Sequence, residues 1–215
     1  MSRFTLLLGG DLVRTPSLDA LISGTRVIAA DSGMRHAATL DIVPELWVGD
    51  FDSVPQDMID AYPHVPRRVF PPEKDKTDGE LAIAAALEAG ATGLTLAGAF
   101  GGERPDHMFL HLTQALQLSE RGIDARLTSG AQEGLPLALG RRHLFDYPQD
   151  MLFSILAFSP LSGLTVEGAK WPLDAVEVAF GSSLTLSNAV DGRLAVTLEK
   201  GRALLVAHLL DDGAH

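Results

Sequence analysis

The sequence predicts an N-terminal α/β domain with a mostly parallel sheet over residues 1–130, followed by an all-β C-terminal sandwich or barrel domain over residues 131–215. Two observations lead to this division. Up to about residue 130, short apolar runs alternate with segments of helical periodicity, which is typical of a parallel sheet covered by helices. Beyond that point, short apolar runs are separated by turn signals and no convincing helical pattern remains, as in antiparallel β-domains.

The N-terminal strands are expected at residues 4–8, 26–30, 46–48, 68–70, 93–97 and 124–127, with helices between them at 17–23, 34–40, 55–61, 78–89 and 105–121. The fourth helix has the clearest signals. Thr77 and Glu80 have capping-box spacing, and Gly90 suits a left-handed helix end. The fifth begins at Pro105 and ends before Gly122, which also follows the usual helix boundaries.

The C-terminal strands are expected at residues 135–139, 151–158, 164–167, 175–180, 183–186, 194–198 and 203–209. Turn signals such as Asp191-Gly192 and Lys200-Gly201 separate them. Residues 129–134 are polar and contain glycine, so they are interpreted as a short linker between the two domains.

Composition excludes several classes of protein. The 215 residues include 17 Lys and Arg against 28 Asp and Glu, a formal net charge of −11, which argues against a general nucleic-acid binder or a surface for anionic lipid. The absence of cysteine excludes disulfides, thiolate metal sites and a cysteine nucleophile. The chain shows neither a signal peptide nor an apolar run of about 20 residues, so a cytoplasmic location is expected.

Polar residues follow successive strands of the predicted parallel sheet. Because ligands of open α/β sheets bind at the carboxyl ends of the strands, these residues are expected to share one site. Gathered carboxylates repel each other unless a hard cation holds them, so the pattern predicts a Mg²⁺–nucleotide site. Asp50 and Asp52 are the strongest candidates, since alternate residues of an extended segment can face one ion. An isolated Asp-x-Asp could equally be a solvated turn, but Asp31, Asp75, Asp78 and Asp106 occupy equivalent positions.

Several other residues are candidates for phosphate binding. Thr77 and Asp78 suit a helix N-cap, and a helix N-terminus also presents N–H groups to phosphate. Lys74 or Lys76 could neutralise phosphate or lie on the surface, and Arg104 suits bidentate contacts. His107 and His111 stand four residues apart without the glutamate or third ligand of a zinc site, so His107 is a candidate for phosphate and His111 for packing. The P-loop and dinucleotide fingerprints are absent.

The C-terminal part contributes Trp171, Ser187 and Asn188. A tryptophan beside Lys170 could stack on a flat cationic ring, while the serine and asparagine contact its polar edge. A core tryptophan and an ordinary turn are the alternative, and composition alone favours that alternative.

Taken together, these segments resemble the thiamine pyrophosphokinase (thiamine diphosphokinase) family. The matching segments fall in the family's order and span nearly the whole chain. They are Asp31-Ser32-Gly33, Pro44-Glu45-Leu46-Trp47-Val48-Gly49-Asp50-Phe51-Asp52-Ser53, Asp75-Lys76-Thr77-Asp78, Gly101-Gly102-Glu103-Arg104-Pro105-Asp106-His107, Gly168-Ala169-Lys170-Trp171-Pro172-Leu173 and Ser187-Asn188.

The resemblance implies a Mg²⁺-dependent enzyme that transfers diphosphate from ATP to the hydroxyl of thiamine and releases AMP. It further implies a homodimer whose active sites combine residues of both subunits. With the residue pattern, it assigns Asp52, Asp78, Arg104 and Asp106 to catalysis, Asp106 as the group that orients the hydroxyl or accepts its proton. It assigns Asp50, Asp52 and Asp78 to the metal, and Asp31, Ser53, Lys74, Thr77, His107, Trp171, Ser187 and Asn188 to ligand binding.

Two departures from the family pattern stand out. Ser32 replaces a glycine of the usual Asp-Gly-Gly, and Glu103 intervenes before the arginine of the usual Gly-Gly-Arg-x-Asp-His. Three alternatives remain open: a pyrophosphokinase acting on a pterin alcohol, a nucleotide-sugar transferase, and a non-catalytic sensor of thiamine or nucleotide.

Overall fold

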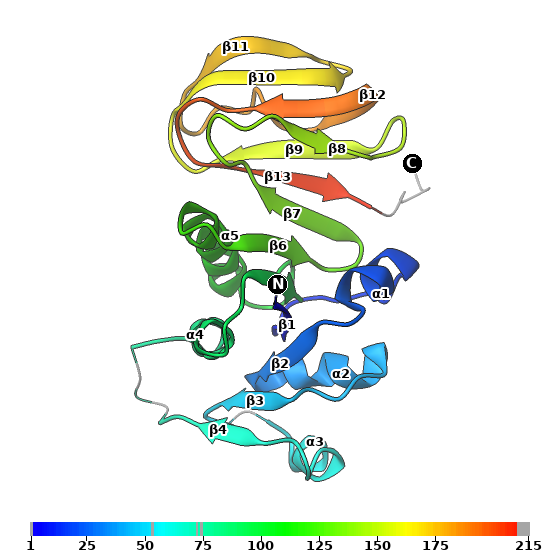
Figure 1. Cartoon of the computed structure of the whole chain (residues 1–215), viewed down its shortest axis with the longest axis vertical. Coiled ribbons are helices and arrows are strands. Elements are labelled where there is room, and N and C mark those ends of the chain that lie inside the picture. The colour runs from blue at the N-terminus through cyan, green and yellow to red at the C-terminus, as the bar shows by residue number, and fades with distance from the viewer. Residues whose placement is uncertain (1, 53, 72, 74, 210–215) are drawn as a thin grey trace.

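The computed structural model describes residues 2–52, 54–71, 73 and 75–209 (Figure 1). The elements in chain order are β1 (Arg3–Leu7), α1 (Pro16–Ile22), β2 (Arg26–Ala30), the 3-10 helix η1 (Asp31–Met34), α2 (Arg35–Leu40), β3 (Leu46–Gly49), α3 (Gln56–Ala61), β4 (Arg67–Val69), α4 (Asp78–Glu88), β5 (Gly93–Ala97), α5 (Pro105–Glu120), β6 (Asp124–Thr128), β7 (Gln132–Pro136), β8 (His143–Phe145), β9 (Leu152–Ala157), β10 (Leu161–Ala169), β11 (Leu173–Val178), β12 (Asn188–Thr197) and β13 (Ala203–His208). In the part of the chain that is described, no helix combines the length and the apolar character needed to cross a membrane.

The N-terminal strands form a parallel sheet in the order β4-β3-β2-β1-β5-β6, which confirms the predicted α/β class. Alternate residues of β1 face opposite sides: Phe4 and Leu6 join the core beneath α4 and α5, whereas Leu7 joins the core beneath α1 and α2. The sheet is therefore covered by helices on both faces. The predicted capping box at Thr77 is present, and Gly90 has a left-handed φ of 84°.

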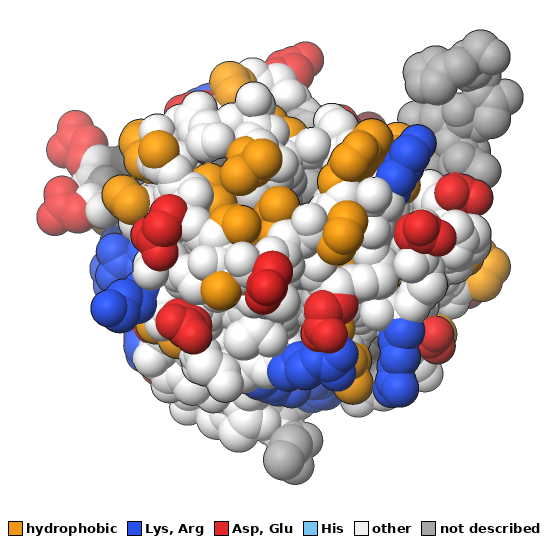
Figure 2. Space-filling view, turned by 90° about the horizontal axis from the view of Figure 1, so that it is seen from above, with side chains coloured by type: hydrophobic (Ala, Val, Ile, Leu, Met, Phe, Trp, Pro, Cys, Tyr) orange, Lys and Arg blue, Asp and Glu red, His pale blue; other side chains and the backbone are white. Residues whose placement is uncertain are grey.

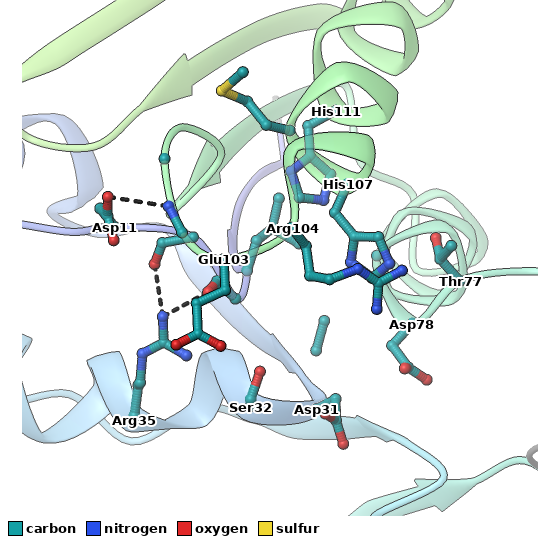
Figure 3. A pocket seen from close by; sticks show the side chains of 18 residues that line it. Asp11, Asp31, Ser32, Arg35, Thr77, Asp78, Glu103, Arg104, His107 and His111 are labelled. Atoms are coloured by element: carbon teal, nitrogen blue, oxygen red, sulfur yellow. Dashed lines mark hydrogen bonds between the residues drawn. The ribbon is translucent and has the colours of Figure 1, made fainter. Parts of the chain in front are cut away.

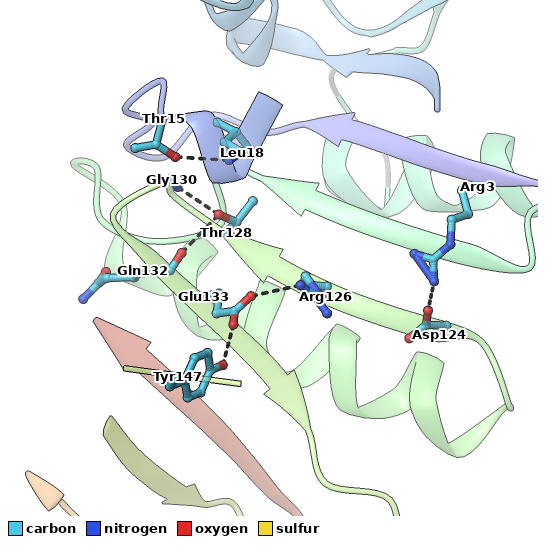
Figure 4. Close-up of polar contacts among 10 residues, drawn as sticks. All are labelled: Arg3, Thr15, Leu18, Asp124, Arg126, Thr128, Gly130, Gln132, Glu133 and Tyr147. Carbon is cyan, nitrogen blue, oxygen red and sulfur yellow. Dashed lines mark hydrogen bonds and ion pairs between the residues drawn. The ribbon is translucent and has the colours of Figure 1, made fainter. Parts of the chain in front are cut away.

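The sheet does not stop where the linker was predicted. Residues 129–131 form a turn, and β7 returns antiparallel to β6 with Leu127 opposite Gly134. Gly130 N donates to Thr128 Oγ1 over 2.8 Å, which tightens this turn (Figure 4). Hydrogen-bonded pairing then continues through β13, β9, β12 and β10 to β11, so one continuous sheet runs through both parts of the molecule.

The C-terminal strands pair antiparallel and enclose a separate apolar core, which confirms the predicted sandwich. Two details of the prediction were wrong. Residues 183–186 form a turn, because Leu184 N bonds the Ser182 hydroxyl and Leu186 N bonds the carbonyl of Ser183, while Leu184 and Leu186 face outward. The short strand β8, which pairs with β12, was not predicted.

A buried polar network joins the two parts. The carboxylate of Glu133 on β7 is almost fully buried and accepts a hydrogen bond from Arg126 on β6 over 3.1 Å. Its other oxygen accepts from the hydroxyl of Tyr147, in the segment before β9 (Figure 4). Burial raises the pKa of Tyr147, and the neighbouring Glu133 raises it further, so the phenol stays protonated and donates.

Removal of this hydroxyl is expected to destabilise the protein. Tyr147→Phe leaves one oxygen of the buried Glu133 carboxylate without its donor, which costs about 1–3 kcal/mol. Urea denaturation should show a lower midpoint for this variant. Tyr62→Phe is the matched control, since the structure shows no hydrogen bond to that hydroxyl among the described residues. Equal midpoints for the two variants would contradict a stabilising role for the network.

Candidate functional site

The candidate site is a cavity of about 570 Å³ at the carboxyl ends of the parallel strands (Figure 3). The chain runs outward from β1 to β4 and then returns to β5 on the other side of β1, so the strand order reverses between β1 and β5. Ligands of open α/β sheets bind at such a switch point. The cavity is lined by residues 8–11, 30–32, 35, 77–79, 101–104, 107, 108 and 111.

Three carboxylates meet at the edge of this cavity. Asp31 opens η1 after β2, Asp50 follows β3, and Asp78 is the first residue of α4. One carboxylate oxygen from each of these half-buried residues lies within 4.8 Å of the others. Oxygen ligands at this separation suit a hard divalent cation such as Mg²⁺. We refer to Asp31, Asp50 and Asp78 as the acidic group.

Backbone packing explains why Asp31 and Asp50 come together. The indole Nε1 of Trp47 donates to the carbonyl of Asp31 over 2.9 Å, which ties η1 to β3. Gly49 lies against Asp31, where an added Cβ would stand 3.2–3.3 Å from its atoms. A side chain at position 49 would therefore crowd the acidic group.

The structure does not bring the carboxylate of Asp52 into the acidic group. The prediction assumed an extended segment, but Phe51 has a left-handed φ of 65° and its ring packs edge-on against Trp47 at 4.9 Å. Asp52 is exposed. The backbone N–H of Asp52 contacts Asp50 Oδ1 at 3.3 Å. Asp52 is not part of the acidic group found among the described residues.

The first turn of α4 faces the cavity. Thr77 Oγ1 accepts from Glu80 N over 3.3 Å, and Thr77 N donates to Glu80 Oε2 over 2.9 Å, so Thr77 caps the helix. Thr77, Asp78 and Gly79 line the cavity, and the positive end of the helix dipole points toward it. The predicted ligand-binding residues Ser53 and Lys74 lie outside the described residues.

Residues 101–107, which we call the arginine turn, bring Arg104 and His107 to the cavity. Asp106 accepts two hydrogen bonds from the Arg104 guanidinium, at 3.0 and 2.6 Å. These bonds lower the pKa of Asp106 to about 2. Asp106 also does not line the cavity, so the arrangement fits a partner of Arg104 better than the predicted proton acceptor.

His111 is buried one turn below His107, and its Nδ1 lies 3.4 Å from the carbonyl of Ala99. Burial lowers the pKa of His111. The ring therefore holds α5 against the loop after β5, as expected for a packing histidine.

The cavity residue Arg35 and its neighbour His36, which does not line the cavity, were missed from the sequence. Arg35 Nη2 donates to the carbonyls of Gly9 and Gly10 over 2.5 and 2.9 Å, and His36 Nε2 donates to Gly10 over 3.0 Å. Burial lowers the pKa of His36. Both lie in a predicted helix, where the sequence gives no signal that side chains reach back to the loop after β1. Glu103 also lines the cavity.

Trp171 lies in the turn between β10 and β11, beside Ser187 and Asn188 at the start of β12, and none of the three lines the cavity. The Asn188 side chain is buried; it donates to Trp171 O over 2.8 Å and accepts from Trp171 N over 3.2 Å. Trp171 is 55% exposed, and the Lys170 ammonium lies 4.9 Å from the centre of its ring. The predicted alternative of a core tryptophan is therefore wrong.

Two protein-family models match the chain. The model described as "Thiamin pyrophosphokinase, catalytic domain" matches residues 19–127. The model described as "Thiamin pyrophosphokinase, vitamin B1 binding domain" matches residues 142–204. The first match contains the acidic group and the arginine turn, and the second contains Trp171 and Asn188.

Individual relatives agree with these matches. The chain is 27% identical to "Thiamine pyrophosphokinase" of Bacillus subtilis (strain 168), with 96% of this chain and 98% of that protein covered. It is similar to the crystal structure of thiamine pyrophosphokinase from Bacillus subtilis, with a TM-score of 0.83, 24% identity and coverage of 98% and 100%. A thiamin pyrophosphokinase from Geobacillus thermodenitrificans gives a TM-score of 0.79 at 25% identity, with both chains fully covered.

Stabilisation of the protein by Mg²⁺ tests the acidic group without any reaction. Saturating Mg²⁺ is expected to raise the melting temperature by several degrees, because the ion binds only the folded arrangement of the three carboxylates. Asp50→Asn should abolish most of this shift. Asp52→Asn is the matched control and should keep it. Differential scanning fluorimetry with and without Mg²⁺ measures the shift in melting temperature of each variant. Loss of this shift in Asp52→Asn alone would show that the metal is held elsewhere.

Proposed function

The chain belongs to the thiamin pyrophosphokinase family, and we propose that it transfers diphosphate from ATP to thiamine, with release of AMP, in a Mg²⁺-dependent reaction. The observation that carries this proposal is the acidic group at the switch-point cavity, beside the arginine turn. Such a site offers oxygen ligands for a cation and cationic side chains for phosphates. A nucleoside triphosphate needs both.

The phosphates of ATP are proposed to lie between the acidic group and Arg104. Bound Mg²⁺ would neutralise phosphate charge and polarise the phosphorus–oxygen bonds. Asp31, Asp50 and Asp78 would hold the ion, while Arg104, His107 and the N–H groups at the start of α4 contact phosphate oxygens. We also keep Ser53, Lys74 and Thr77 as proposed contacts to the nucleotide.

In the proposed reaction, the oxygen of the primary alcohol of thiamine attacks the β-phosphorus of ATP. An oxygen–phosphorus bond forms, and the bond between the β-phosphorus and the bridging oxygen to the α-phosphorus breaks. AMP leaves with this oxygen and its electron pair, and the alcohol proton is released to water. Such transfers depend mainly on positioning and on stabilisation of charge. Arg104 supplies the positive charge, and Asp106 orients Arg104 by accepting two hydrogen bonds from its guanidinium. We therefore propose Asp106 as a positioning residue.

Thiamine is proposed to bind between two subunits of a homodimer. Trp171 would stack on its rings, with Ser187 and Asn188 beside it, and these residues would come from the partner subunit. Two observations support this arrangement. Trp171 does not line its own chain's cavity, and hydrophobic side chains gather on the end of the molecule formed by the C-terminal strands (Figure 2). Large exposed apolar residues of this part include Leu152, Trp171, Phe180, Leu184 and Leu186.

We also propose a cytoplasmic location. The cysteine-free sequence supports it, because such a chain has no disulfide that would require an oxidising compartment.

The reaction is tested by incubating the protein with thiamine, ATP and Mg²⁺ and separating the products by chromatography. We expect thiamine diphosphate and AMP in equal amounts, and none with a chelator. Asp50→Asn should lower kcat by at least roughly 100-fold because it removes a proposed metal ligand, whereas Asp52→Asn should lower it by less than about tenfold. Binding of thiamine without product would contradict the proposal and favour a sensor.

The shared site is tested by mixing two inactive variants. Asp50→Asn disables the proposed phosphate end, and Trp171→Ala disables the proposed thiamine end. After unfolding and joint refolding, half of the dimers are mixed, and each mixed dimer contains one intact site, so about a quarter of the wild-type activity should return. Light scattering that shows only monomer, or a mixture that stays inactive, would contradict the shared site.

A further inference from the structure

Two side chains that depart from the family pattern lie on the same wall of the cavity. Ser32 belongs to η1 after β2, and Glu103 belongs to the arginine turn after β5, yet both line the cavity next to Arg35. In Figure 3, the carboxylate of Glu103 points toward the hydroxyl of Ser32, on the side of the cavity away from Asp78. The two residues together add a carboxylate and a hydroxyl to this wall.

The wall is held in place by the loops behind it. Arg35 donates to the carbonyls of Gly9 and Gly10, over 2.5 and 2.9 Å. The next residue, Asp11, accepts from Gly102 N over 3.0 Å, directly before Glu103. The backbone just before Glu103 is therefore tied to the loop after β1, and this loop is in turn held by Arg35 of α2.

Ser32 lies close to the same loop. It follows Asp31 directly, and its Oγ lies 3.0 Å from the position that a Cβ on Gly9 would take. The hydroxyl therefore lies close to the acidic group on one side and to the loop after β1 on the other.

We propose that Ser32 and Glu103 recognise the ribose hydroxyls of the donor nucleotide. This inference rests on the proposed function and names the part of the donor that this wall contacts. The sugar of a nucleotide is joined directly to its first phosphate, so with phosphates at the acidic group the sugar lies within reach of Ser32. A carboxylate only accepts hydrogen bonds, and the sugar hydroxyls are donors that it can bind strongly.

The charge of Glu103 argues against a phosphate at this position. A carboxylate repels phosphate, whereas Arg104 and His107, on the adjacent wall, attract it. The ribose fits the position beside Glu103, because its hydroxyls are uncharged donors that lie next to the first phosphate.

Calorimetric titration without metal tests this inference apart from turnover. The probes are AMP, 2′-deoxyAMP and 3′-deoxyAMP. The wild-type protein should bind AMP roughly tenfold or more tightly than at least one deoxy analogue, because that analogue loses a hydrogen bond to a charged group. Glu103→Ala should reduce this ratio to about threefold or less, and Ser32→Gly should reduce it partly. Glu177→Gln is the control. The Glu177 carboxylate accepts a hydrogen bond from the Ser162 hydroxyl in the C-terminal sheet, and the variant should keep the wild-type ratio of affinities.

Each contrary outcome has a separate meaning. Equal affinity of the wild-type protein for all three probes overturns the inference, as does a ratio that Glu103→Ala leaves unchanged. If Glu103→Ala instead raises only the KM for thiamine, the carboxylate contacts the acceptor and the inference is wrong. Discrimination between the probes without formation of thiamine diphosphate would overturn the proposed reaction and leave the ribose contact intact. Failure of AMP to bind overturns the inference, whereas the proposed reaction is still decided by the formation of thiamine diphosphate.

Discussion

The close approach of three loops at the switch point is the constraint on which the cavity depends. Gly10 lies against the carbonyl oxygens of Gly98 and Phe100, and Gly33 lies against the carbonyl of Leu7, so a Cβ at either position would overlap backbone atoms. Because these loops touch backbone to backbone, side chains from strands that are distant in the sequence reach one space. The acidic group and the arginine turn face each other for this reason, and a bulkier side chain in these loops would move them apart.

The cationic side chains around the cavity are oriented by the protein itself. Arg104 is held by Asp106, and Arg35 is held by backbone carbonyls of the loop after β1. Side chains oriented before a charged ligand arrives lose less conformational entropy on binding and need less reorganisation as charge develops. The excess of acidic residues in the chain is thus compatible with an anionic ligand, since a few oriented cations and a bound metal ion act locally.

Much of this architecture could be predicted from the sequence, and the errors have physical causes. The alternation of apolar runs and helical patterns placed the parallel sheet, and the shared edge of parallel strands brought Asp31 and Asp78 together as expected. The position of Asp52 outside the acidic group was not foreseen, because sequence spacing does not reveal the left-handed turn at Phe51. Arg35 was missed because nothing in a helical pattern shows where a long side chain ends. The turn before β7 was taken for a linker because the two have the same polar, glycine-containing composition.

The continuous sheet that joins the two parts has a consequence for how the chain folds during synthesis. The α/β part is made first, but β7 at its margin receives its second neighbour, β13, only when residues 203–208 have been made. Until then an open row of N–H and C=O groups is available to other chains. A nascent chain that pauses before its last strand therefore exposes this edge, and truncation just before residue 203 is expected to promote aggregation of an otherwise complete α/β sheet.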